Sequence, residues 1–276
     1  MAAATGIAEL FNLQGRTALV TGGSNGLGGS IARVLAQAGA DLIIHYASAY
    51  DDKIPQAQTA QDQKDAIEAL GRRCYLIDQD LGEADAVQKI FEASQAIAHV
   101  DILVINASVQ CDKTLEEITG EDLDREYVIN YKATVFLLQQ YVPVMAKSGW
   151  GRVLSIGSIQ QMRPRRTNPT YAGLKAAQET LMRQFACEYG HRQVLFNTLS
   201  PGLIATERNR QLWDNNDAWW QQNSSVNPLG IISGPDDYAG AALLLCSDAA
   251  RFVTGANLFA TGGGHLSYLE RDYTER

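Results

Sequence analysis

RTALVTGGSNGLGGSIARVLAQAGA, residues 16–40, predicts a strand, a tight turn and a helix in immediate succession. The apolar run before Thr21 is short and ends in glycines, which is typical of a buried strand. After the turn, apolar side chains recur at helical spacing as far as Gly39. This order places the free N–H groups of a helix N-terminus beside a glycine-rich turn, where a phosphate group can bind.

The same alternation continues along the chain and predicts seven strands and six helices. Strands are expected at 16–22, 40–46, 73–78, 101–107, 151–158, 194–200 and 257–263, and helices at 30–40, 65–71, 86–98, 125–149, 171–190 and 237–248. We therefore expect a single doubly wound α/β domain of Rossmann type over residues 1–276, in which a seven-stranded parallel sheet carries helices on both faces. Several helices are expected to end at a left-handed glycine, namely Gly39, Gly71, Gly149 and Gly190.

Three segments depart from this alternation. Residues 47–66 are polar and predict a loop before the second helix. Residues 207–226 hold Trp213, Trp219 and Trp220 among polar residues, which indicates a mobile helical flap over a substrate. Packing of these tryptophans over the core or between subunits is an equal alternative. Residues 265–276 form a short charged tail.

Composition favours small-molecule chemistry. The net charge is −8 and the basic residues form no long run, which argues against nucleic acid and anionic membranes as partners. No apolar stretch reaches the roughly 18 residues that span a bilayer, and the N-terminus does not resemble a signal peptide, so a cytoplasmic protein is expected. The cysteines are far apart without a CxxC pair, which predicts no metal site and four reduced core residues, Cys74, Cys111, Cys187 and Cys246.

The glycine spacing is TGxxxGxG and differs from the commoner GxGxxG. With this spacing and the motifs that follow, the chain resembles the short-chain dehydrogenase/reductase family from Gly15 to about Gly264. The matching residues occur in the family's order and are Gly22, Gly26 and Gly28, then Asp80–Leu81, Asn106–Ala107, Asn130, Ser158, Tyr171 and Lys175 in YxxxK spacing, Pro201–Gly202 and Thr206.

The resemblance implies a nicotinamide cofactor, NAD or NADP. An acid at the end of the second strand would bind the ribose 2′-hydroxyl of NAD, but Tyr46 occupies that position, which favours NADP. No arginine lies beside Tyr46, however, and Asp51 and Asp52 follow shortly. The predicted cofactor-binding residues are Gly22, Ser24, Asn25, Gly26, Leu27, Gly28, Tyr46, Ser48, Asp80, Leu81, Asn106, Ala107, Tyr171, Lys175, Pro201, Gly202, Ile204 and Thr206.

Tyr171 and Lys175 are the predicted centre of the chemistry. Hydride transfer to a carbonyl needs a proton donor for the developing alkoxide, and the reverse reaction needs a base. Lys175 lies one helical turn after Tyr171, so its ammonium group is expected to favour the tyrosine phenolate. By resemblance, Lys175 also holds the nicotinamide ribose and Ser158 hydrogen-bonds the reacting oxygen. Asn130 would help to anchor a water that relays protons past Lys175.

Three positions differ from the family pattern. Ile105 replaces the first Asn and Ser108 the Gly of the Asn-Asn-Ala-Gly turn, and Thr261 replaces the Asp of the Asp-Gly-Gly ending. None of these changes removes a group that hydride transfer requires. A slight difference in cofactor packing near residues 105–108 is expected.

Polar and basic residues near the predicted cleft favour a sugar, polyol or sugar-acid substrate. Arg163, Arg165 and Arg166 lie between Ser158 and Tyr171 and can pair with an anionic group, although a solvated loop or a subunit contact is equally consistent. Reduction of a 3-oxoacyl thioester or small ketone is the main alternative, and a non-catalytic cofactor-binding subunit is another. The resemblance implies a homotetramer formed through 121–147, 171–189 and the last strand. The predicted substrate-binding residues are Ser158, Gln160, Arg163 and Trp213.

Overall fold

The computed structural model describes residues 6–54 and 58–266, and its centre is a sheet of seven parallel strands. The spatial order is β3-β2-β1-β4-β5-β6-β7. The chain therefore adds β2 and β3 on one side of β1, and then β4 to β7 on the other side. This arrangement confirms the predicted doubly wound Rossmann-type fold. The strands are β1 (Thr17–Thr21), β2 (Asp41–Tyr46), β3 (Cys74–Asp78), β4 (Ile102–Ile105), β5 (Gly151–Ile156), β6 (Val194–Pro201) and β7 (Asn257–Ala260).

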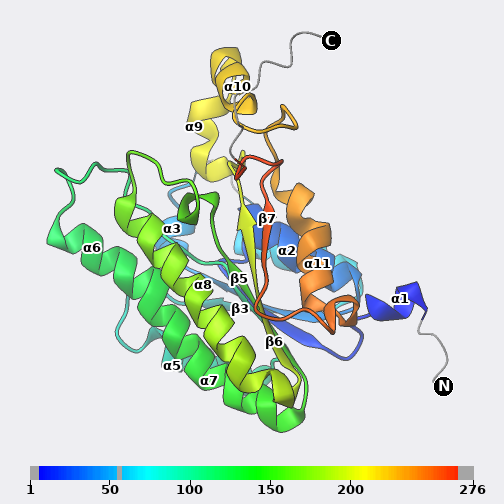
Figure 1. Ribbon diagram of the computed structural model, residues 1–276. Coiled ribbons are helices and arrows are strands. Elements are labelled where there is room, and N and C mark those ends of the chain that lie inside the picture. The colour runs from blue at the N-terminus through cyan, green and yellow to red at the C-terminus, as the bar shows by residue number, and fades with distance from the viewer. Residues whose placement is uncertain (1–5, 55–57, 267–276) are drawn as a thin grey trace.

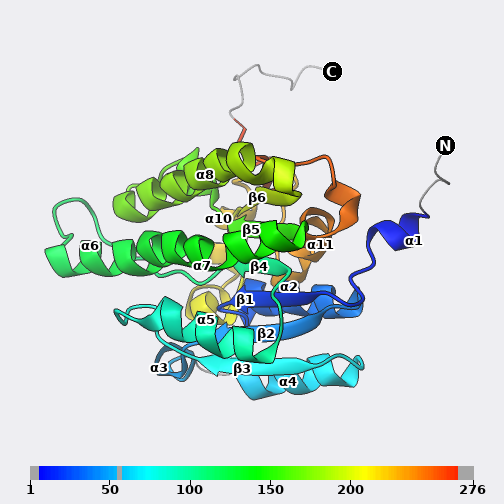
Figure 2. The same ribbon diagram turned by 90° about the horizontal axis from the view of Figure 1, so that it is seen from below.

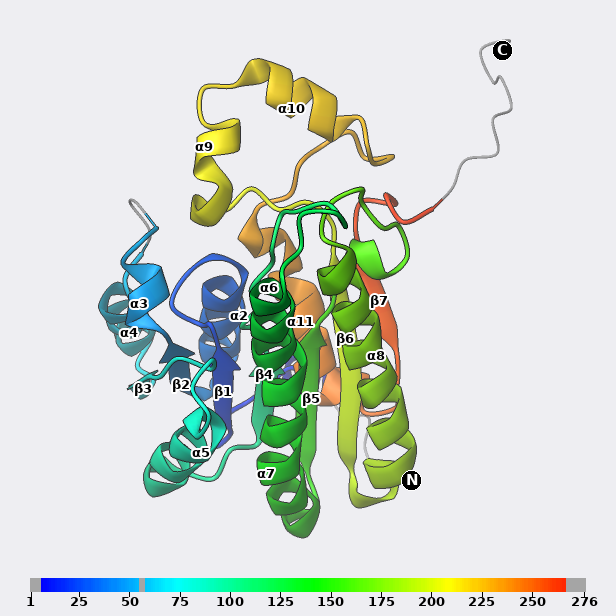
Figure 3. The same ribbon diagram turned by 90° about the vertical axis from the view of Figure 1, so that its left-hand side faces the viewer.

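Helices cover both faces of the sheet, as Figures 1 and 3 show. The longer ones are α2 (Gly26–Gln37), α4 (Ala60–Ala69), α5 (Ala86–Ile97), α6 (Gly120–Glu126), α7 (Ala133–Ser148), α8 (Pro169–Tyr189), α10 (Asp217–Ser224) and α11 (Ala239–Cys246). Four-residue helices are α1 (Ile7–Leu10), α3 (Ser48–Asp51) and α9 (Arg210–Trp213), and 3₁₀ turns occupy Ile159–Gln161, Gly190–Arg192, Glu207–Asn209, Pro235–Tyr238 and Asp248–Ala250.

Alternate residues of each strand build two separate cores. On β1, for example, Leu19 faces the layer of α5, α7 and α8, whereas Ala18 and Val20 face the layer of α2 and α11. All three side chains are fully buried. Figure 2, the view from below, shows the sheet between these two layers. Burial on both faces explains why the strands read as continuous apolar runs in the sequence.

The polar segment at 47–66 is not simply the loop that we predicted. It contains α3 directly after β2, and the second long helix begins at Ala60 instead of near 65. The reason for the early start is a capping box, in which the Thr59 hydroxyl accepts from the Asp62 N–H and the Asp62 carboxylate accepts from the Thr59 N–H. Polar composition hid this helix because it buries few side chains.

The predicted helix at 125–149 is interrupted by a π-helical segment, Tyr127–Lys132, between α6 and α7. This wider winding frees the Asn130 carbonyl for side-chain partners. It accepts from the Gln178 amide at 2.6 Å and from the Thr134 hydroxyl at 3.0 Å. Such π segments occur frequently at functional sites.

Two local predictions fail. Gly39, Gly71 and Gly149 have positive φ as expected, but Gly190 has φ −55°. The chain continues there as a 3₁₀ turn, and Gln193 adopts the left-handed conformation instead. Among the cysteines, only Cys74 and Cys246 are buried, whereas Cys111 is half-buried and Cys187 is exposed on α8.

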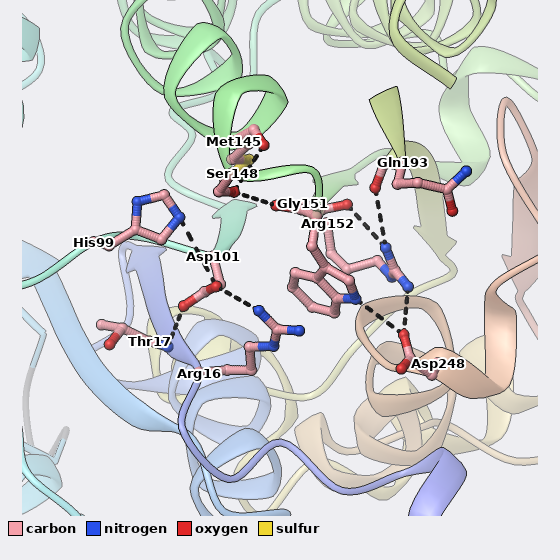
Figure 4. Close-up of polar contacts among 11 residues, drawn as sticks. Arg16, Thr17, His99, Asp101, Met145, Ser148, Gly151, Arg152, Gln193 and Asp248 are labelled. Atoms are coloured by element: carbon pink, nitrogen blue, oxygen red, sulfur yellow. Dashed lines mark hydrogen bonds and ion pairs between the residues drawn. The ribbon is translucent and has the colours of Figure 1, made fainter. Parts of the chain in front are cut away.

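Ion pairs and hydrogen bonds hold the amino-terminal edge of the sheet together, at the opposite end from the cavity described below (Figure 4). Asp101, before β4, pairs with Arg16 at 2.9 Å and accepts from the N–H of Thr17 at 3.0 Å. Arg152 on β5 is 3% exposed and pairs with Asp248 at 2.7 Å. Within the described part of the chain, no helix has the length and apolar content needed to cross a membrane.

Candidate active site

A cavity of about 910 Å³ opens over the carboxyl ends of the strands, where the chain order of the sheet reverses between β1 and β4. Ligands of doubly wound folds bind at this point. The glycine turn after β1 lines one end of the cavity, and Ser158, Tyr171 and Lys175 line the other. Helices α9 and α10 stand beyond the same edge of the sheet, as Figure 3 shows.

The glycine turn is shaped by close approach of the β4 end. Gly22 and Gly26 have φ of +61° and +54°, a backbone conformation that other residues rarely adopt. The Asn106 amide donates to the carbonyls of Thr21 and Gly22, both at 2.9 Å. A Cβ at Gly28 would lie 2.1 Å from the Gly22 oxygen and 2.5 Å from the Asn106 nitrogen. Gly28 is thus required for the turn itself.

The N-terminus of α2 is left open toward the cavity. Asn25 precedes the helix, but its side chain does not cap the helix and instead donates to the Ser24 hydroxyl at 3.1 Å. Gly22, Ser24, Asn25, Gly26, Leu27 and Gly28 all line the cavity. Uncapped N–H groups beside a glycine turn fit the pyrophosphate of a dinucleotide, since they offer donors and a positive dipole end.

His45 supports this turn and was missed by the sequence predictions. Its Nδ1 accepts from the Gly22 N–H at 3.4 Å, and its Nε2 lies 2.8 Å from the Gln79 carbonyl. Burial lowers the pKa of His45 to about 4, so the ring is neutral at pH 7. Its position one residue before Tyr46, at the end of β2, was the available signal.

The β2 end is where the two forms of the cofactor would be distinguished. Tyr46 lines the cavity, whereas the backbone N–H of Ser48 is bound to Asp78 at 3.0 Å and Ser48 is not among the described lining residues. Asp51 lines the cavity and accepts from the Ser24 hydroxyl at 2.6 Å. Burial raises the pKa of Asp51, and the hydrogen bonds from Ser24 and Asn25 lower it in part.

The remaining predicted cofactor residues also line the cavity. They are Asp80 and Leu81 after β3, Asn106 and Ala107 after β4, and Pro201 at the end of β6 with Gly202, Ile204 and Thr206 after it. Each group follows the carboxyl end of a parallel strand, so the sheet topology brings them to one edge.

Tyr171 and Lys175 lie one turn apart on α8, with the Lys175 Nζ 5.6 Å from the centre of the Tyr171 ring. Lys175 is 1% exposed and donates to the Ile156 carbonyl at 2.7 Å. Burial, with a smaller contribution from Arg208, lowers the pKa of Lys175 to about 7. A lysine that loses its charge so readily is a strong candidate for proton chemistry.

The pKa of Tyr171 is raised, which contradicts the sequence expectation that Lys175 would stabilise the phenolate. Burial is the largest cause, and it outweighs the opposing effects of Arg208 and of hydrogen bonds with Ser158 and Ser108. Ser158 follows β5 and its hydroxyl accepts from the Gln160 N–H at 3.1 Å. Ser108, a departure from the family pattern, therefore adds a second hydroxyl beside Tyr171.

Asn130 lies behind this group and is not among the described residues that line the cavity. Its side chain pairs with Val109, accepting from the backbone N–H at 2.9 Å and donating to the carbonyl at 2.8 Å. The amide side chain thus fixes the loop after β4 against the π segment. The Asn130 carbonyl already accepts from Gln178 and Thr134, so the water-binding role of Asn130 stays a prediction.

The predicted substrate residues are not all brought together. Gln160 and Arg163 line the cavity, and Arg163 donates to the Gly264 carbonyl. Trp213 is not among the described lining residues, because its indole packs against Trp220 and donates to the Thr206 carbonyl at 3.1 Å. The segment instead contributes to the lining through Arg208, Asn209, Gln211, Leu212, Asn223 and Val226.

Comparisons with known proteins agree with this geometry. Residues 22–265 match a family model described as enoyl-(acyl carrier protein) reductase. The hydroxynaphthalene reductase-like protein Arp2 of Metarhizium anisopliae is 32% identical, over 91% of this chain and 96% of its own.

Two solved structures cover nearly the whole chain. A 3-oxoacyl (acyl-carrier-protein) reductase from Agrobacterium tumefaciens with NADP bound is 40% identical, with a TM-score of 0.88 over 95% of this chain and 99% of its own. A gluconate 5-dehydrogenase from Burkholderia cenocepacia in complex with NADP and tartrate is 28% identical, with a TM-score of 0.85 over 95% of this chain and 100% of its own.

Proposed function

The chain belongs to the short-chain dehydrogenase/reductase family of oxidoreductases, and we propose that it interconverts a secondary alcohol and a ketone or aldehyde using NAD(P). One observation carries this proposal. A single cavity joins a glycine turn suited to a pyrophosphate with Ser158, Tyr171 and a buried Lys175. A non-catalytic cofactor-binding subunit would not require a buried lysine beside a tyrosine and a serine.

Tyr171 is the proposed proton donor and acceptor for the substrate oxygen, with Ser158 holding that oxygen in place. The cofactor, when bound, supplies or accepts the hydride. Lys175 would contact the nicotinamide ribose, and its lowered pKa lets it exchange a proton near neutral pH. The glycine turn and the N-terminus of α2 would hold the pyrophosphate.

NADP is the proposed form of the cofactor. Tyr46 leaves the end of β2 without an acid, and both solved relatives named above were solved with NADP bound. Asp51 argues against NADP because its carboxylate, which accepts a hydrogen bond from Ser24 of the glycine turn, would repel a 2′-phosphate.

A sugar, polyol or sugar acid is the proposed substrate class. Besides the glycine turn, the cavity is lined by hydrogen-bonding groups, among them Gln160, Gln211 and Asn223. Similarity to the gluconate 5-dehydrogenase supports the same class. Reduction of a 3-oxoacyl thioester is the second candidate, favoured by the 40% identity with the A. tumefaciens reductase.

Three further proposals concern the domain organisation and the assembly around this site. We propose that residues 1–276 form one dinucleotide-binding and catalytic unit. Residues 207–226 are the proposed flap, and the lack of buried residues in α9 and α10 favours this proposal. The tail at 265–276 lies largely outside the described residues. Exposed Phe136 on α7 and Leu258 on β7 support a homotetramer, which light scattering after size-exclusion chromatography would test.

The function is tested by following reduced-nicotinamide absorbance across polyols, aldoses, aldonates and 3-oxoacyl thioesters with NAD and NADP in both directions. Turnover of hydroxylated substrates with a higher kcat/KM for NADP is the expected result. A dominant rate with 3-oxoacyl thioesters would transfer the assignment to the second candidate. Tight cofactor binding without turnover of any compound would contradict the proposal of an enzyme.

A further inference from the structure

Arg208 lies in the cavity beside the proposed proton-transfer residues. It belongs to the Glu207–Asn209 turn after β6 and shares the cavity lining with Ser158, Tyr171 and Lys175. Its positive charge is among the causes that lower the pKa of both Tyr171 and Lys175, whereas neither Arg163 nor Arg165 contributes. Of the three arginines that line the cavity, Arg208 is thus the one whose field reaches both groups.

The backbone around Arg208 is held firmly. The Asn209 side chain accepts from the Thr206 N–H at 2.8 Å and donates to the Ile204 carbonyl at 2.9 Å. The Trp213 indole donates to the same Asn209 oxygen at 2.9 Å. Together with a fourth bond from the Thr206 hydroxyl at 3.2 Å, these contacts of one amide side chain hold the Glu207–Asn209 turn that presents Arg208 to the cavity.

The guanidinium of Arg208 is available to a ligand. Within residues 6–54 and 58–266, it makes no ion pair or hydrogen bond. The neighbouring Arg210 lies 3.6 Å from Asp214 and 5.6 Å from the centre of the Trp213 ring, and Arg163 is bound to the Gly264 carbonyl. An arginine fork held in a cavity suits a planar oxyanion such as a carboxylate, which it binds through paired, charge-assisted hydrogen bonds.

Hydroxyl-binding groups lie in the same part of the cavity. Gln160 is 8% exposed, and its side-chain oxygen has no partner among the described residues. Gln211 and Asn223 also line the cavity. A ligand that satisfies both the cation and the amides carries a carboxylate and several hydroxyls.

We propose that Arg208 binds the carboxylate of a polyhydroxy acid while Tyr171 and Ser158 engage the reacting carbon–oxygen group elsewhere on the same molecule. The substrate class is therefore a sugar acid, in preference to a neutral sugar or polyol. This inference rests on the proposed function and specifies the substrate of the same site.

The test compares binding of acids with binding of the matching neutral alcohols. Titration calorimetry on the full chain with saturating NADP⁺ would use D-gluconate and D-galactonate against D-sorbitol and galactitol. The acids are expected to bind the unchanged protein more tightly than the alcohols. Arg208→Gln should weaken acid binding by about tenfold or more, the magnitude of a lost charge-assisted contact, with alcohol binding changed less than about twofold.

Two further variants separate the contact from general effects. Arg208→Lys keeps the charge but loses the planar fork and should recover part of the acid affinity. Arg210→Gln removes an arginine of the same segment that is already paired with Asp214, and it should leave both affinities unchanged. Equal binding of acids and alcohols by the unchanged protein, or equal losses for both in Arg208→Gln, would overturn the inference.

Failure of this inference is distinguishable from failure of the proposed function. If polyols or 3-oxoacyl thioesters are turned over but acids bind no better than alcohols, the oxidoreductase assignment stands and the role of Arg208 is wrong. If no compound is turned over while Arg208→Gln selectively loses acid binding, the inference stands and the proposed activity is wrong.

Discussion

At the scale of single residues, the environment of Tyr171 and Lys175 matters more than their spacing. Burial shifts the pKa of Lys175 downward and that of Tyr171 upward, so each group favours its neutral form. Lys175 can therefore release a proton near neutral pH, whereas the Tyr171 hydroxyl stays protonated there. Ser108 and Arg208 modify the same tyrosine and come from other segments of the chain.

Tyr171→Phe tests the proposed proton donor. The variant keeps the ring and removes the hydroxyl, so kcat should fall by about 10²- to 10⁴-fold, the usual contribution of general acid–base catalysis. Cofactor affinity, measured by fluorescence titration with NADPH, should change little. Unreduced turnover of the best substrate would rule out the assigned role of Tyr171.

Lys175→Met tests the pKa of the buried lysine through stability. In the unfolded chain the lysine stays protonated up to about pH 10, whereas in the folded chain its pKa is about 7. Between these values the unfolded state binds more protons, so the free energy of unfolding should rise with pH, by at most about 1.4 kcal/mol per pH unit. Below pH 7 both states are protonated and this dependence disappears.

Urea unfolding at several pH values between 6 and 9.5, without added nucleotide, measures this effect. The difference between the unchanged protein and Lys175→Met should grow in favour of the unchanged protein as pH rises. A difference that is constant across the range would mean that Lys175 keeps an ordinary pKa.

At the scale of elements, the glycine turn depends on contacts between β1, α2 and the end of β4. Asn106 binds two carbonyls of the turn, and His45 binds its Gly22 N–H from β2. The turn is therefore held from both neighbouring strands before any ligand is bound. Such preorganisation reduces the entropy lost on binding.

Gly28→Ala tests how tightly this turn is packed. The added Cβ would lie 2.1 Å from a backbone oxygen, so the turn must move, and we expect a loss of stability of about 1–3 kcal/mol together with weaker NADPH binding. Gly173→Ala is the matched control on α8, since nothing lies within 4 Å of its added Cβ. That change should raise stability by about 0.5–1 kcal/mol and leave cofactor binding intact.

At the scale of the whole molecule, stability and chemistry lie at opposite edges of the sheet. The cavity collects residues from the carboxyl ends of the strands, and the ion pairs of Figure 4 join the amino-terminal ends. Arg152 is nearly inaccessible, and the Trp150 ring lies between it and Arg16, with guanidinium carbons 4.2 Å and 3.8 Å from the ring centre. This edge is expected to support the fold without influencing turnover.

Asp248→Asn tests that separation. It leaves the buried Arg152 without its ion pair, but Asp248 is half exposed, so the cost should be about 1–2 kcal/mol, below the range for a fully buried pair. KM and kcat should stay unchanged in the folded variant. Asp85→Asn, in an exposed pair with Lys89, is the control and should cost less than about 0.5 kcal/mol in the same urea titration. A change in kcat for Asp248→Asn would show that the amino-terminal edge of the sheet influences turnover, contrary to this prediction.

Sequence patterns were sufficient for the sheet, its parallel strands and the order of the motifs, because local periodicity and glycine spacing carry that information. They also named Ser158, Tyr171 and Lys175, which the tertiary structure brings to one cavity. They missed α3 and the early start of α4, since polar helices with few buried residues leave a weak periodic signal.

Folding alone decided which polar groups meet and which charges are buried. Contacts between residues distant in sequence raise the pKa of Tyr171 and place Arg208 beside it. Such contacts also bind the Asn130 side chain to Val109 and let His45 support the glycine turn. Desolvation and electrostatic effects act through space, so no spacing along the chain could predict them.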